Sequence, residues 1–214
     1  MPTGFKLSLP SNNYPNRRSG VGINIGKSLY YTSGLLFTDR FKYSSAWISH
    51  GTNFSPWDNG GAIDIDSNGQ VLSLSQYAVG SLILRDLGTH YPSGQYVLLY
   101  DGTGTIAARF DVTLVSSAAN RIVYNIATPS DAGVHIYITA TNASPNNVRN
   151  IRFVPVTYES TYLTTDVFNP TMLDLLKPFK VIRFMDLQHI NNSTDGADWN
   201  ARVNINTNTQ ADTK

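Results

Sequence analysis

The sequence predicts an all-β protein, a jelly-roll-like antiparallel β-sandwich that is followed by a short C-terminal helix–strand segment. Two observations indicate the sandwich. Short runs rich in Val, Ile, Tyr and Phe recur along the chain, and nearly every gap between them holds Gly, Pro, Asn or Ser. A third observation indicates the C-terminal helix–strand segment: a helical pattern replaces the regular strands after Pro155.

The first 20 residues are polar and turn-rich, and we expect an extended arm or a first edge strand there. In "GVGINIG", residues 20–26, apolar residues alternate with small or polar ones, which predicts a half-buried strand. Residues 28–49 are ambiguous, since "GLLFTDRF" could form one helical turn while "SAWISH" is typical of an extended segment. "GAIDIDSNGQVLSL", residues 61–74, predicts a β-hairpin with a turn at "SNG".

Six further runs with strand character complete the predicted sandwich. They are "SLILRDL", "GQYVLLYDG", "TIAARFDVTLVSS", "NRIVYNIA", "GVHIYITATN" and "VRNIRFVPV". The turn residues between them, such as those of "YPSGQ", "DGTG" and "ASPNN", favour antiparallel neighbours. Residues 1–156 are therefore assigned to the sandwich.

Residues 157–214 are predicted to hold a connector, a helix–strand unit and a loose tail. Asn169 is a suitable N-cap and Pro170 a suitable first helical residue, so a helix is expected over residues 169–179. The run "KVIRFM", residues 180–185, predicts a strand that is largely buried, because its apolar residues are nearly continuous. Past Trp199 the Asn/Thr-rich tail offers little apolar surface, and we expect it to be mobile.

The composition excludes some classes of function. Only 14% of the residues are charged, and polarity comes instead from 20 Asn, 20 Ser and 20 Thr. A net charge of +1 without a basic run argues against a nucleic-acid partner. Neutral hydrogen-bonding surfaces of this kind suit a glycan ligand or an exported protein, and they equally suit a plain turn-rich β-protein.

Disulfides and thiolate metal sites are excluded because the chain has no cysteine. No window approaches 18 apolar residues, so no membrane span or membrane partner is predicted. The start "MPTGFKLSLP" has no apolar signal-peptide core. The expected location is nevertheless extracellular, with any leader already removed.

Several ordered blocks carry a resemblance to a known group of proteins. They are "GVGINIGKSLYYTSGLLFTDRFKYSSAWIS", "WDNGGAIDIDSNGQVLSL", "LRDLGTHYPSGQYVLLYDGTGTI", "VRNIRFV" and "FNPTMLDLLKPFKVIRFMD". Together, over about residues 20–200, they resemble the N-terminal region of large secreted bacterial proteins that look like glycoside hydrolases or cellulose-associated proteins. In that group a β-sandwich precedes a (β/α) barrel.

The resemblance implies that "KVIRFMD" is the first strand of such a barrel, with a catalytic barrel domain following in a longer parent protein. Asp186 would then lie at the rim where barrel active sites are found, with Trp199 in the following loop. Leu187 stands where the group often has Trp, which would remove one sugar contact. The alternative is that the unit packs on the sandwich as a structural appendix.

Aromatic side chains in loop-like segments are the best candidates for a ligand site. The C–H faces of sugars pack on aromatic rings, and sugar hydroxyls bond to Asp and Asn. Trp57, Asp58 and Asn59 stand together in "NFSPWDNGG", a setting in which a Trp is hard to bury as strand core. Trp47 and Tyr31 are further candidates, although the Ala and Ile beside Trp47 favour a core position.

Catalytic and metal-binding signals are weak. A glycosidase needs two carboxylates at a defined separation, and no spacing in the chain selects a pair, so no catalytic residue is predicted. Asp64, Asp66 and Asn68 match the first half of a calcium loop, but Ser75 stands where an EF-hand needs Glu. A structural calcium ion held there is the one cofactor considered, and a plain β-turn is the alternative. The four histidines show no metal-ligand spacing.

The function predicted from these features is non-catalytic binding of a polysaccharide, cellulose or another plant or microbial glycan, by aromatic stacking and polar hydrogen bonds. Two alternatives remain open. The chain could be a truncated or unrecognised glycoside hydrolase, in which a cleft would hold two close carboxylates. It could also be a structural or adhesive surface module without a sugar site.

Overall fold

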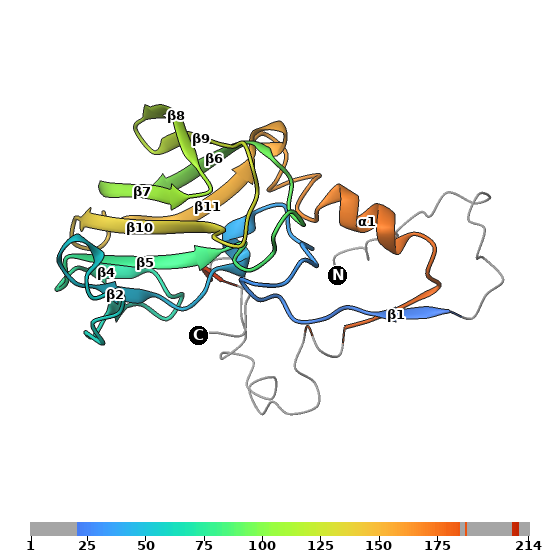
Figure 1. Cartoon of the computed structure of the whole chain (residues 1–214), viewed down its shortest axis with the longest axis horizontal. Coiled ribbons are helices and arrows are strands. Elements are labelled where there is room, and N and C mark those ends of the chain that lie inside the picture. Colours follow the sequence, from blue (N-terminus) through green and yellow to red (C-terminus); the bar gives the residue numbers. More distant parts are fainter. Residues whose placement is uncertain (1–20, 185–186, 188–206, 210–214) are drawn as a thin grey trace, which may run out of the picture.

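The computed structural model describes residues 21–184, 187 and 207–209 of the chain, and its main body is a sandwich of two four-stranded antiparallel sheets (Figure 1). The first sheet has the order β2 (Ile48–His50), β5 (Ala78–Ile83), β10 (Val134–Thr141), β7 (Gly104–Phe110). The second has the order β11 (Arg149–Pro155), β6 (Gly94–Asp101), β9 (Arg121–Ile126), β8 (Thr113–Ala118). The predicted all-β sandwich is confirmed, while its jelly-roll connectivity stays a prediction.

Smaller elements connect these strands. The expected hairpin forms from β3 (Asp64–Ile65) and β4 (Val71–Ser73), and its turn is held by the Gly69 N–H, which donates to the Asp66 carbonyl over 3.0 Å. Three 3₁₀ turns occur in the described residues, η1 (Arg40–Tyr43), η2 (Thr52–Phe54) and η3 (Val156–Tyr158). The ambiguous stretch 28–49 thus contains both a helical turn and a strand.

The core lies between the two sheets and follows the alternation of their strands. In β10, Ile136 and Ile138 point inward and are fully buried. Tyr96 of β6 stacks on Phe153 of β11 with ring centroids 5.0 Å apart. Since the Tyr124 hydroxyl of β9 accepts a hydrogen bond from the backbone of β7 at 2.9 Å, the sheets are also linked by polar contacts.

The connector after β11 covers the outer face of the second sheet. Val97, Val123 and Val154 point outward from β6, β9 and β11, and Tyr162 of the connector packs on them. All four side chains are buried, with exposures of 8% or less. This face is therefore closed by an apolar layer from the chain itself.

The C-terminal unit lies beside the sandwich (Figure 1). The predicted helix is shorter than expected, α1 (Pro170–Leu176), and the Asn169 side chain caps it by accepting from the Thr171 N–H over 3.3 Å. Asn169 also donates to the Leu35 carbonyl at 2.8 Å, which attaches the helix start to the sandwich. No helix among the described residues has the length and hydropathy that crossing a membrane requires.

The strand after this helix forms but is not buried, which corrects the expectation for residues 180–184; Met185 lies outside the described residues. It is β12 (Val181–Arg183), and it pairs in parallel with β1 (Gly22–Asn24) as an isolated two-stranded sheet. Val181 is 59% exposed and Phe184 40%. A two-stranded ribbon has no second layer of its own, and Val181, Ile182 and Phe184 are all exposed to solvent.

The expectation of a loose tail is wrong at residues 207–209, which are buried. The Asn208 N–H donates to the Asn68 carbonyl at 3.0 Å, and its side-chain amide donates to the Gly69 carbonyl at 2.7 Å. The Thr209 hydroxyl donates to the Ser44 carbonyl at 2.9 Å. These are polar contacts to backbone groups, so a search for apolar residues in the tail could not reveal them.

Candidate functional site

The outer face of the first sheet carries the most unusual group of side chains in the described part of the chain. Since His50 of β2 lies opposite Ala78, and His135 of β10 lies opposite Leu82 and Arg109, all of them point away from the core. Gly80 lies between the two histidine strands. A β-carbon there would overlap His135 Nε2 and lie 2.9 Å from His50 Nε2. Glycine at this position therefore makes room for the two imidazole rings.

The histidines form a hydrogen-bonded chain in which the position of every proton follows from the donors. Arg109 Nε can only donate, and it lies 2.9 Å from His135 Nδ1, which must accept. The proton of neutral His135 is then on Nε2, which donates to His50 Nε2 at 3.1 Å. His50 keeps its proton on Nδ1, which donates to the Trp57 carbonyl. Every donor and acceptor in this series of hydrogen bonds has a partner only when both rings are neutral.

The surroundings keep the rings in that neutral state. Both histidines are fully buried, and burial together with the nearby Arg109 charge lowers the pKa of His135 to about 3. Burial also lowers the pKa of His50, and the hydrogen bond to the Trp57 carbonyl only partly offsets this effect. Near neutral pH, His135 therefore stays an acceptor for Arg109.

The loop after β2 folds back over this face. The Gly51 N–H donates to the Pro56 carbonyl at 3.1 Å, and the Asn59 N–H donates to the Ser49 carbonyl at 2.9 Å. Phe54 has a φ of 61°, a left-handed conformation that is a true outlier for a bulky residue. The fold thus accepts backbone strain of about 1 kcal/mol or more to place this ring.

A second strained residue brings another ring to the same place. Strand alternation would turn Phe110, the last residue of β7, to the inner side beside Ala108. Its φ of 80° turns the ring outward instead. The ring then lies with its centroid 5.7 Å from that of His135 and 6.1 Å from that of Trp57. Backbone strain at both Phe54 and Phe110 serves one cluster of rings.

The rings surround the guanidinium of Arg109. Its central carbon lies 3.6 Å from the ring centroid of Phe54, and it lies 5.3 Å and 5.1 Å from those of Trp57 and Phe110. Tyr137 closes the group at 5.6 Å. Cations are attracted to the negative faces of aromatic rings, so this arrangement stabilises the charge and fixes its orientation.

Three rings of the region are partly open to solvent, and we call them the ring patch: Trp57, Phe110 and Tyr77, with exposures of 38%, 42% and 41%. The planes of Trp57 and Phe110 are 26° apart. Tyr77 joins through Phe54, whose ring centroid is 5.6 Å from its own. Because the histidines lie directly beneath Trp57, with centroids 4.7 Å away, this ring is held in place.

The residues predicted from the sequence divide between this site and other places. Trp57, Asp58 and Asn59 lie in the loop that forms it. Asp58 Oδ1 accepts from the Gly60 N–H at 2.9 Å, and the Asn59 amide donates to Gln76 at 2.8 Å, so both also hold the loop. Trp47 lies on the opposite side of the sheet, packed against the core, and its indole donates to the Gly69 carbonyl at 2.8 Å.

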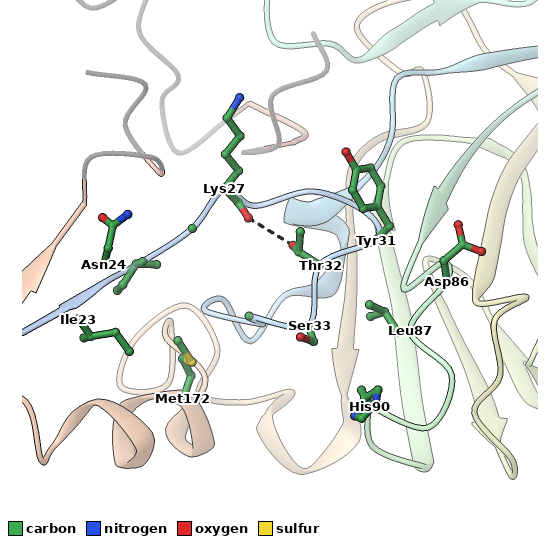
Figure 2. A pocket seen from close by; sticks show the side chains of 13 residues that line it. Ile23, Asn24, Lys27, Tyr31, Thr32, Ser33, Asp86, Leu87, His90 and Met172 are labelled. Atoms are coloured by element: carbon green, nitrogen blue, oxygen red, sulfur yellow. Dashed lines mark hydrogen bonds between the residues drawn. The ribbon is translucent and has the colours of Figure 1, made fainter. Parts of the chain in front are cut away.

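Tyr31 lines a separate hollow of about 550 Å³ between β1, α1 and the loop that follows β5. Figure 2 shows Tyr31 with Lys27, Asp86, His90 and Met172 around this hollow. Tyr31 is therefore not part of the ring patch. Asp186 and Trp199 lie outside the described residues, so the contacts expected for them stay predictions.

The predicted calcium ligands do not form a cluster in the described residues, among which no group of three acidic or histidine side chains could hold a metal ion. Asp66 Oδ1 accepts from the N–H groups of Asn68 and Gln70 at 2.8 Å and 2.9 Å, which is the geometry of a plain turn. Asp64 accepts from the Ser73 hydroxyl at 2.7 Å. Calcium binding stays a prediction.

The described carboxylates are all engaged within the protein. Glu159 accepts from Nε and Nη2 of Arg121, at 2.6 Å and 2.7 Å. Burial acts to raise the pKa of Asp111, but the hydrogen bonds that it accepts, from Tyr91 and Ser130 among others, together outweigh this effect and lower the pKa. These carboxylates are thus used in structural contacts.

Sequence reasoning missed His50, His135, Arg109, Phe54 and Phe110. The two histidines are 85 residues apart, and no local spacing indicates that their strands flank β5. A usable signal was Gly80 in the middle of a largely apolar strand, because glycine within a strand often marks a close approach. Comparison with protein-family models, curated proteins and solved structures finds no match to this chain.

Proposed function

We propose that the protein is a non-catalytic carbohydrate-binding module and that it binds a polysaccharide through the ring patch on the outer face of the first sheet. The observation that carries this proposal is the set of partly exposed rings held rigidly over a hydrogen-bonded base. Rigid aromatic rings lose little conformational entropy when a ligand packs on them, which is why they often dominate binding energy.

The polar groups around the rings suit sugar hydroxyls. Asn53, Asp58 and Asn59 are exposed in the same loop, and the Tyr77 hydroxyl lies 3.4 Å from Asn53 Oδ1. Amide, hydroxyl and carboxylate groups at the rim of an apolar platform match a ligand with C–H faces and hydroxyl edges.

The test is affinity electrophoresis against a panel of soluble polysaccharides, with pull-down on insoluble ones. We expect Trp57→Ala to weaken retention about tenfold or more, as is usual for a central aromatic contact. Leu114→Ala is the matched control, because Leu114 is a 58% exposed apolar residue on the second sheet. Equal retention of wild type and Trp57→Ala, with the fold intact, would refute the proposed site.

A further inference from the structure

Among the described residues, Arg109 has no counterion. Arg109 is partly buried, and its pKa is lowered from the ordinary value because burial disfavours the charge. None of the ion pairs among the described residues involves it. A partly buried charge in a protein is normally paired with an opposite charge. The rings around Arg109 stabilise its charge but do not neutralise it, so an anionic ligand would add to that stabilisation.

The donors that a partner would use are open. Arg109 makes its one hydrogen bond in the described part of the chain through Nε, to His135. Nη1 and Nη2 have no acceptor there, and they are not among the buried side-chain atoms that lack a partner. Since an unpaired atom that was fully buried would belong to that group, both nitrogens keep some contact with solvent. Their N–H groups are therefore available to a ligand.

The guanidinium is also held in one orientation. Phe54 lies against its face at 3.6 Å, and the histidine chain that ends on the Trp57 carbonyl fixes its Nε. Because a planar fork that is held in place loses less entropy when it binds, it favours an acceptor with two oxygens in a plane. A carboxylate has this geometry.

We propose that the site binds a uronic-acid residue of an acidic polysaccharide, with the sugar face on Trp57 and its carboxylate on the Nη groups of Arg109. This inference rests on the proposed function and names its substrate class. The ring of Trp57 and the guanidinium are 5.3 Å apart, within the span of one sugar and its exocyclic group. A neutral sugar could bond to the same N–H groups but would bring no opposite charge.

The experiment compares polygalacturonate and alginate with their carboxyl-reduced neutral forms, and uses dextran sulfate as a probe for general charge attraction. Binding is measured by affinity electrophoresis and by calorimetry at low and moderate salt. We expect wild type to bind at least one of the two acidic glycans about tenfold more tightly than its reduced form, since charge-assisted hydrogen bonds contribute that much. Dextran sulfate is expected to bind more weakly.

The variants are Arg109→Gln, Arg109→Lys and the control Arg85→Gln, each first shown to unfold as wild type does. Arg109→Gln should lose the preference for the acidic form, so that its affinities for the acidic and reduced forms become equal. Arg109→Lys should keep part of the preference, because it retains the charge without the fork. Arg85 pairs with Asp86 away from the site, so Arg85→Gln should bind like wild type.

Three results would overturn the inference. Equal binding of the acidic and reduced forms, or retention on neutral glucans alone, would refute recognition of a carboxylate by Arg109. Either result would leave the proposed function in place. Dextran sulfate binding as tightly as the uronates would mean that the site attracts any anion. Failure to bind any glycan in either form would overturn both the inference and the proposed function.

Discussion

The two outer faces of the sandwich are built in opposite ways. On the second sheet Val97, Val123 and Val154 lie under Tyr162, an apolar layer sealed by the chain itself. On the first sheet the corresponding layer contains two buried histidines and Arg109, and the loop above it leaves rings partly open. A surface that only had to be stable would resemble the second face, because buried polar groups are costly unless every one is satisfied. We therefore assign the proposed ligand site to the outer face of the first sheet.

The largest effect is expected on the sealed face. Tyr162→Ala removes a buried ring from the valine layer and should lower the free energy of unfolding by about 3 kcal/mol. Urea unfolding measures this. Leu163→Ala, at the neighbouring 63% exposed residue, should change it by about 0.5 kcal/mol or less. If Tyr162→Ala folds normally but no longer retains a glycan, the second face has a role in binding, and the contrast between the two faces is wrong.

A smaller effect is expected beneath the histidines. Gly80→Ala places a methyl group against both imidazole rings and should lower the free energy of unfolding by about 2 kcal/mol. Because it displaces the base under Trp57, it should also weaken glycan retention. Gly34→Ala serves as control, since a β-carbon there meets no atom within 4 Å. Unchanged stability and retention in Gly80→Ala would mean that the histidines do not support the site.

The smallest effect concerns pH. The pKa of His135 is about 3 in the folded protein and near 6.5 in the unfolded chain, so the unfolded state binds more protons between these values. Stability should therefore fall as the pH falls through this window, by roughly 1 kcal/mol between pH 7 and pH 5.5. Urea unfolding at several pH values measures the slope.

His135→Gln should flatten this slope, whereas His90→Gln, at an exposed histidine, should keep it. A slope that persists unchanged in His135→Gln would show that other groups cause the acid sensitivity. His50 adds to the slope in the same direction, because its pKa is lowered as well.

The sandwich could be predicted because local signals sufficed. Turn residues separate the strands, and the Asn169–Pro170 start indicated the helix. The site was predicted only at Trp57 and its two neighbours, where the loop composition was unusual. Its base could not be predicted, because it depends on strand order, which brings His50 and His135 together across β5. The outward turn of Phe110 depends on a left-handed backbone that a Phe in a strand pattern does not indicate.

The most direct test of the account follows the tryptophan indole N–H signals by NMR while a retained polysaccharide fragment is added. Trp57 and Trp47 lie on opposite sides of the same sheet. Trp57 belongs to the ring patch, and the indole N–H of Trp47 donates a hydrogen bond to the Gly69 carbonyl. We expect the Trp57 indole signal to shift or broaden with ligand, and the Trp47 signal to stay in place. A shift at Trp47 or around Tyr31, with no change at Trp57, would contradict the account.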